Sequence, residues 1–117
     1  MSDIQLDHER LDAYRVAVSL DKLVTAMAKR SRRGHGWLWD QAQRASGSVA
    51  LNIGEACGRE GADRARCYRI ARGSALETDV ALTLLANRGA CADGDRGNAR
   101  ELTVRIVSML KRLIDVA

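Results

Sequence analysis

The chain has 117 residues and a formal net charge of +4, with 19 Lys and Arg residues against 15 Asp and Glu residues. This length can bury one hydrophobic core but not two, so we expect a single domain over residues 1–117. Hydrophobic residues make up 46 % of the sequence, but no apolar run reaches the ~18 residues of a membrane span. The N-terminus, MSDIQLDHER, lacks the apolar region of a signal peptide, and we therefore expect a cytoplasmic protein.

The first predicted element is a helix over residues 7–30. Apolar residues recur there at helical spacing on a broad face, namely Leu11, Tyr14, Val18, Leu20, Leu23, Val24 and Met27. The helix is expected to end in the sequence SRRGHG, because Gly34 and Gly36 interrupt the pattern.

The second and third predicted helices cover residues 37–57 and 62–87, separated by the sequence GREG. Small residues recur at every fourth position in both, as two ladders: Ala42, Ser46, Ala50, Gly54 and Gly58, then Cys67, Ala71 and Ala75. Residues four apart lie above one another in a helix. Because Gly costs about 1 kcal/mol relative to Ala inside a helix, Gly47, Gly54 and Gly73 suggest a close approach of two helix backbones.

Polar residues run beside these ladders. We expect five of them to form a structural polar seam between the two helices, with buried ion pairs that fix the helix register: Asn52, Glu55, Arg59, Arg72 and Glu77. Ser48, Ser74 and Asp79 belong to the same pattern.

The fourth predicted helix covers residues 98–116, after a loop at residues 90–97. Its core stripe is Leu102, Ile106, Met109, Leu110 and Leu113. A second apolar line, formed by Val104, Val107 and Ile114, suggests that the helix covers a further surface, as in self-association. The first helix is similarly broad, with Ala13, Val16, Ala17 and Leu20 beside its stripe. A wide core face padded with alanine is the alternative.

Four helical segments with short connections and no period-2 apolar pattern predict an all-α protein. The expected architecture is an antiparallel up-down-up-down four-helix bundle. The small number of aromatic residues and the absence of Phe and Pro favour a core of Ala, Leu, Val and Ile between closely packed helices.

The two middle helices resemble a known family, the bundle proteins encoded by intervening sequences in bacterial 23S ribosomal RNA genes. The second helix matches the family pattern at Gln41, Arg44, Ala45, Ser48, Asn52, Ile53, Glu55, Gly58 and Arg59, and the third at Ile70, Ala71, Gly73, Ser74, Glu77 and Asp79. Gly54 and Ala56 exchange the usual Ala and Gly, and Asp79 stands where Glu is commoner. The resemblance implies a four-helix bundle that assembles as a ring-shaped homopentamer. A related branch serves as accessory protein to reverse transcriptases of diversity-generating retroelements.

A compact basic cluster follows the first helix: Lys29, Arg30, Arg32 and Arg33, with His35 close behind. Such a cluster can neutralise phosphates and makes these four residues the candidate nucleic-acid-binding site. Cations at a helix C-terminus also interact favourably with the helix dipole, so a solvated end without a ligand is the alternative. The aromatic interleaving typical of a single-strand binder is thin, because only Trp37 and Trp39 lie near the cluster and Trp37 could equally anchor the second helix in the core.

The sequence contains no convincing catalytic constellation, and we expect neither enzymatic activity nor a cofactor. No phosphate loop of the Walker type occurs, and a nucleophile at Ser48 or Ser74 would lack a His base. The His and Cys residues do not have zinc-site spacing; the three cysteines, Cys57, Cys67 and Cys91, are expected to be free thiols.

Two classes of function remain open from the sequence. In the first, the protein is a non-catalytic oligomeric scaffold that binds RNA, DNA or a reverse transcriptase. In the second, it is a structural bundle that interacts with other proteins only. No small-molecule substrate and no membrane partner is expected in either case.

Overall fold

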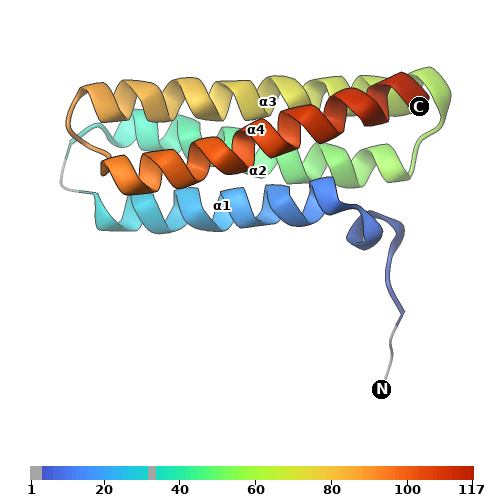
Figure 1. Cartoon of the computed structure of the whole chain (residues 1–117), viewed down its shortest axis with the longest axis horizontal. Coiled ribbons are helices and arrows are strands. Elements are labelled where there is room, and N and C mark those ends of the chain that lie inside the picture. Colours follow the sequence, from blue (N-terminus) through green and yellow to red (C-terminus); the bar gives the residue numbers. More distant parts are fainter. Residues whose placement is uncertain (1–3, 32–33) are drawn as a thin grey trace.

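A computed structural model describes residues 4–31 and 34–117 of the chain. Within these residues, a short 3-10 helix, η1 (Asp7–Arg10), precedes four α-helices: α1 (Asp12–Arg30), α2 (Gly36–Cys57), α3 (Gly61–Asn87) and α4 (Asp93–Val116). The four α-helices lie side by side and alternate in direction (Figure 1). α2 packs on α1 and α3, and α4 packs on α3 and α1. The predicted all-α, antiparallel up-down-up-down four-helix bundle is thereby confirmed.

The predicted first helix is divided, because Leu11 is extended between η1 and α1. At this break the Arg15 guanidinium donates a hydrogen bond of 2.6 Å to the Glu9 carbonyl oxygen and also pairs with Asp12. A side chain thus satisfies a carbonyl group that the backbone would satisfy in a continuous helix.

The fourth helix begins at Asp93, five residues earlier than predicted, and Gly94 and Gly97 lie inside it. The reversal between α3 and α4 is compact because Gly89 adopts a positive φ of 72°. The Gly89 and Ala90 N–H groups donate to the carbonyl oxygens of Ala86 and Leu85, the pattern of a Schellman motif. Asp93 and Asp95 then occupy the first turn of α4, where the helix dipole favours negative charge.

The core is aliphatic and draws on all four helices. Its largest fully buried apolar side chains are Leu20, Val24, Val49, Ile53, Leu82, Leu85, Ile106 and Leu110. Ala13, Val16, Ala17 and Leu20 of α1 also face this core. Their expected role in covering a further surface is therefore wrong, and the alternative of a broad core face padded with alanine holds for α1.

The two ladders of small residues differ in how far they are buried. Cys67, Ala71 and Ala75 are all buried, whereas the α2 ladder is buried only at Ala42 and Ser46 and reaches an exposed position at Gly58. Four residues advance about 400° around an α-helix, so a four-residue ladder drifts by about 40° per step. The longer α2 ladder therefore drifts from buried positions to the surface along the helix.

The expected close backbone approach at three glycines is not found. A Cβ atom added at Gly54 or Gly73 would meet no atom within 4 Å, and one at Gly47 would meet only the Asp21 carboxylate at 3.7 Å. The residues of α2 and α3 that are fully buried include alanines instead, namely Ala42, Ala56, Ala71 and Ala75.

Candidate functional site

The α1–α2 connection and the α3–α4 loop lie at the same end of the bundle, which we call the loop end (Figure 1). Lys29 is exposed there, and Arg30 pairs with Asp95 of α4 at 2.9 Å while remaining more than half exposed. Arg32 and Arg33, the other two predicted nucleic-acid-binding residues, lie outside the described residues. The loop end also receives Arg88, from the C-terminal end of α3, which the sequence had not joined to the cluster.

An open pocket of about 390 Å³ lies at the loop end. It is lined by Arg30, Ser31, His35 and Arg88, and by residues 89–92 of the α3–α4 loop. One of these, Cys91, is half-buried; burial and, more weakly, the nearby Asp95 carboxylate raise the pKa of its thiol. The pocket therefore combines two guanidinium groups and an imidazole with backbone from the opposite loop.

The two tryptophans near this pocket occupy opposite environments. Trp39 is 5 % exposed, and its indole N–H donates a hydrogen bond of 2.8 Å to the Ser31 hydroxyl oxygen, which ties α2 to the end of α1. Trp37 is 59 % exposed, and the Arg88 guanidinium lies 5.3 Å from its ring centroid. Trp39 is therefore the core anchor, and Trp37 remains on the surface.

Part of the predicted polar seam does lie along the α2–α3 contact. The Ser48 and Ser74 hydroxyls form a hydrogen bond of 2.8 Å across it. The half-buried Asn52 amide donates to the Ser48 hydroxyl at 3.0 Å and to the Ser48 carbonyl oxygen at 2.9 Å. This cluster is neutral and links α2 to α3.

The charged members of the polar seam are not buried, contrary to the expectation. Glu55 and Arg59 pair with each other at 2.9 Å within one helix side, at side-chain exposures of 53 % and 48 %. The hydrogen bond that the Arg59 guanidinium donates to Glu55, together with the negative charge of Glu55, raises the pKa of Arg59. Arg72 is half-buried and Glu77 is exposed. Glu55, Arg59 and Glu77 therefore lie on the surface of the bundle.

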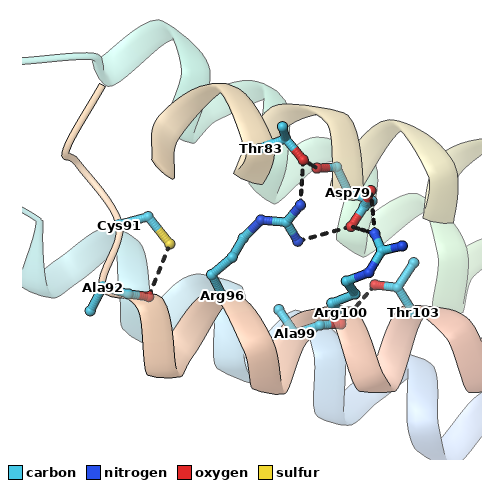
Figure 2. A network of polar contacts seen from close by, with 8 residues as sticks. All are labelled: Asp79, Thr83, Cys91, Ala92, Arg96, Ala99, Arg100 and Thr103. Carbon is cyan, nitrogen blue, oxygen red and sulfur yellow. Dashed lines mark hydrogen bonds and ion pairs between the residues drawn. The ribbon is translucent and has the colours of Figure 1, made fainter. Parts of the chain in front are cut away.

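The most buried ion pair of the described residues joins α3 to α4. Asp79 was named from the sequence, but its arginine partners were not connected with it. The Asp79 carboxylate accepts hydrogen bonds from Arg96 at 3.0 Å and from Arg100 at 3.3 Å, and Arg96 also donates to the Thr83 hydroxyl (Figure 2). Asp79 thus points toward α4 and not toward the polar seam. The signal available in the sequence was the i, i+4 spacing of Arg96 and Arg100, which the predicted loop over residues 90–97 obscured.

Next to this network lies an apolar groove between α3 and α4, with a volume of about 400 Å³. Leu76, Val104 and Val107 contribute its apolar lining, and Arg100 and Lys111 are its cations. Leu76 continues along α3 into exposed Val80 and Leu84, at four-residue steps. Val107 and Ile114 also pack partly against the core, so Val104 is the most exposed member of the predicted second apolar line.

Fold and surfaces define an all-α bundle protein with a cationic loop end and an exposed apolar groove on its α3–α4 side. The model of the family described as 23S rRNA-intervening sequence protein matches residues 9–112. The chain belongs to this family, as the pattern in the two middle helices had indicated. No curated protein shows significant similarity to it. Within the described residues, no helix combines the length and apolar character needed to cross a membrane.

Proposed function

We propose that this protein is a non-catalytic, self-associating scaffold that binds nucleic acid at its loop end. The observation that carries the proposal is the convergence of Arg30, at the end of α1, with Arg88, at the end of α3, around one open pocket; Lys29, exposed and next to Arg30 in the sequence, adds a further cation at the same helix end. Asp95 offsets part of the charge of Arg30, but the sequence supplies two more cations in Arg32 and Arg33. Cations gathered from separate segments can neutralise several phosphates of one strand.

The nucleic-acid proposal is tested by retention on heparin and by binding of a fluorescent RNA at low salt. The test variant carries Lys29→Gln, Arg30→Gln, Arg32→Gln and Arg33→Gln. Each phosphate contact contributes roughly one unit to the slope of log affinity against log salt, so the variant should bind more weakly and with a shallower slope.

A charge-matched control separates a site from net charge. It replaces four exposed arginines of α3 and α4 by Gln: Arg66, Arg69, Arg105 and Arg112. This control should retain most of the affinity. An equal loss of affinity in both variants would show that binding depends on the net charge of the protein and not on a site at the loop end.

The apolar groove supports the second part of the proposal, that copies of the chain associate through the α3–α4 side. Leu76, Val80, Leu84 and Val104 form an exposed apolar surface that the bundle itself does not cover. Contiguous exposed apolar surface is typical of an interaction site. The family resemblance favours five copies, so a homopentamer is our proposed stoichiometry.

Self-association is tested by analytical ultracentrifugation of the wild type and of Val104→Glu. Placing a carboxylate in the groove should shift the distribution toward the monomer, whereas Val116→Glu, an exposed valine of the same helix outside the groove, should leave it unchanged. A wild-type monomer at tens of micromolar would overturn this part of the proposal.

A bundle that binds proteins only is the second candidate, and the groove is the observation that favours it. The two candidates separate in the heparin and RNA experiments, because a purely protein-binding bundle would not be retained. A reverse transcriptase is the protein partner that the resemblance proposes. A reverse transcriptase gene next to the gene of this chain would support that role, and a gene located inside a ribosomal RNA gene would favour the intervening-sequence branch.

A further inference from the structure

We infer that the loop end prefers single-stranded nucleic acid to duplex, with Trp37 as the surface on which an unpaired base stacks. The inference rests on the proposed nucleic-acid binding and adds to it the form of the strand and a stacking residue that the basic cluster does not contain.

The first support is the exposure of Trp37. The chain has two tryptophans and no phenylalanine. Trp39 already fulfils the structural role, since it is buried and its indole N–H is bonded to Ser31. Trp37, two residues earlier and on another side of α2, leaves most of its ring in solvent. A large aromatic ring held on a helix with most of its surface in solvent is the element that single-strand binders use for stacking.

The second support is the position of Arg88, which belongs to two features at once. Its guanidinium lies over Trp37 at 5.3 Å from the ring centroid, and its side chain lines the pocket together with Arg30 and His35. A base stacked on Trp37 therefore lies beside the cations that can neutralise the phosphates of its own strand. A cation over an exposed ring is held only weakly, so a base can displace it or share the ring with it.

The strand preference follows from the geometry of stacking. In a duplex each base is covered on both faces by its neighbours, and only phosphates, sugars and groove edges are accessible. An unpaired base offers a free face, and stacking is tolerant of sequence because every base has one. Duplex binding should therefore depend on the cations alone, and single-strand binding on the cations and Trp37 together.

The experiment compares a fluorescent single-stranded oligonucleotide with its duplex, for RNA and for DNA, at one fixed low salt concentration. Three variants accompany the wild type: Trp37→Ala removes the ring, Trp37→Phe keeps a smaller one, and Leu51→Ala truncates an exposed apolar residue of the same helix. Trp37→Ala should weaken single-strand binding roughly tenfold and duplex binding less than twofold. Trp37→Phe should retain part of the affinity, and Leu51→Ala all of it.

Intrinsic fluorescence gives a readout that does not depend on truncation. Stacking should quench Trp37 when an unlabelled single strand is added to the wild-type protein, and the quench should vanish in Trp37→Phe, which retains the buried Trp39. Circular dichroism and sedimentation establish that each variant keeps the fold and the assembly of the wild type. If Trp37→Ala fails this check, Trp37→Leu replaces it.

Two results would overturn the inference while leaving the proposed function intact. In the first, Trp37→Ala keeps its affinity for both single strand and duplex, while the fourfold Gln variant of the basic cluster loses both. In the second, Trp37→Ala loses affinity for single strand and duplex to the same extent. Failure of the wild type to bind any nucleic acid at low salt would instead remove the proposed function, and the inference with it.

Discussion

At the scale of single residues, Asp79 is the carboxylate most engaged in the described part of the structure. Arg96 and Arg100 of α4 both donate to it, and Arg96 also reaches Thr83, so that four side chains join α3 to α4 (Figure 2). The side chains of Asp79 and Arg96 are only 23 % and 18 % exposed. Their interaction is therefore screened less by water than that of the surface pair Glu55–Arg59.

Replacing Asp79 by Asn should destabilise the protein by about 2 kcal/mol. The substitution keeps the volume of the side chain but leaves the Arg96 guanidinium half-buried without its counter-charge. Urea denaturation followed by circular dichroism measures the change. Glu55→Gln is the matched control, and because its pair is exposed we expect a change within about 0.5 kcal/mol. Equal effects of the two substitutions would contradict this ranking.

This ranking reverses the sequence-based expectation for Glu55, and the reason lies in helix geometry. Residue type and i, i+4 spacing indicate which side chains of one helix can meet. They do not give the rotation of the helix about its own axis, which decides whether such a pair faces a neighbour or solvent. Ser48 turns toward α3, where its hydroxyl bonds to that of Ser74, whereas Glu55 and Arg59 remain exposed.

At the scale of whole elements, the glycines around the α3–α4 reversal have opposite roles. Gly97 lies inside α4 with open space around its Cα, whereas Gly89 holds the positive φ that closes the Schellman motif. Gly97→Ala should stabilise the protein by up to about 1 kcal/mol through helix propensity. Gly89→Ala should destabilise it by about 1 kcal/mol or more, because an L-residue is strained in the left-handed region.

Thermal and urea unfolding of the two glycine variants measure both signs. They also test the early start of α4. If residues 93–97 were a loop, as the sequence suggested, Gly97→Ala would bring little or no gain.

The number of helices, their order and most of their apolar faces could be predicted from the sequence, because apolar residues at helical spacing such as Val24, Met27, Ile106 and Leu110 leave few alternatives. The boundaries were less predictable. Gly94 and Gly97 predicted a loop, but both lie inside α4. The Asp residues of the first turn and the packing of α4 outweigh the low helix propensity of glycine. Neither the division at Leu11 nor the meeting of Arg30 with Arg88 has a local signal, since both depend on tertiary contacts.

At the scale of the whole molecule, the bundle has two distinct ends. The α1–α2 and α3–α4 connections form the loop end, and the α2–α3 turn lies at the opposite end (Figure 1). The proposed nucleic-acid site occupies one end, and the α3–α4 groove runs along one side. Copies that meet side by side would leave their loop ends free, so self-association and nucleic-acid binding are compatible. Val104→Glu should accordingly reduce affinity for a long RNA more than for a short one, because fewer sites are linked.

The half-buried thiols offer a chemical footprint of this division. Burial raises the pKa of both Cys91, in the loop-end pocket, and Cys57, at the far end of α2. Since the thiolate is the reactive form, both thiols should be alkylated slowly by iodoacetamide near neutral pH. Alkylation should become faster as the pH rises past 9.0, the ordinary pKa of a thiol. Occupation of the loop-end pocket should slow Cys91 alone, with Cys57 as an internal reference. The ratio of the two modified peptides in a mass spectrum would then report where an oligonucleotide sits without any label on it.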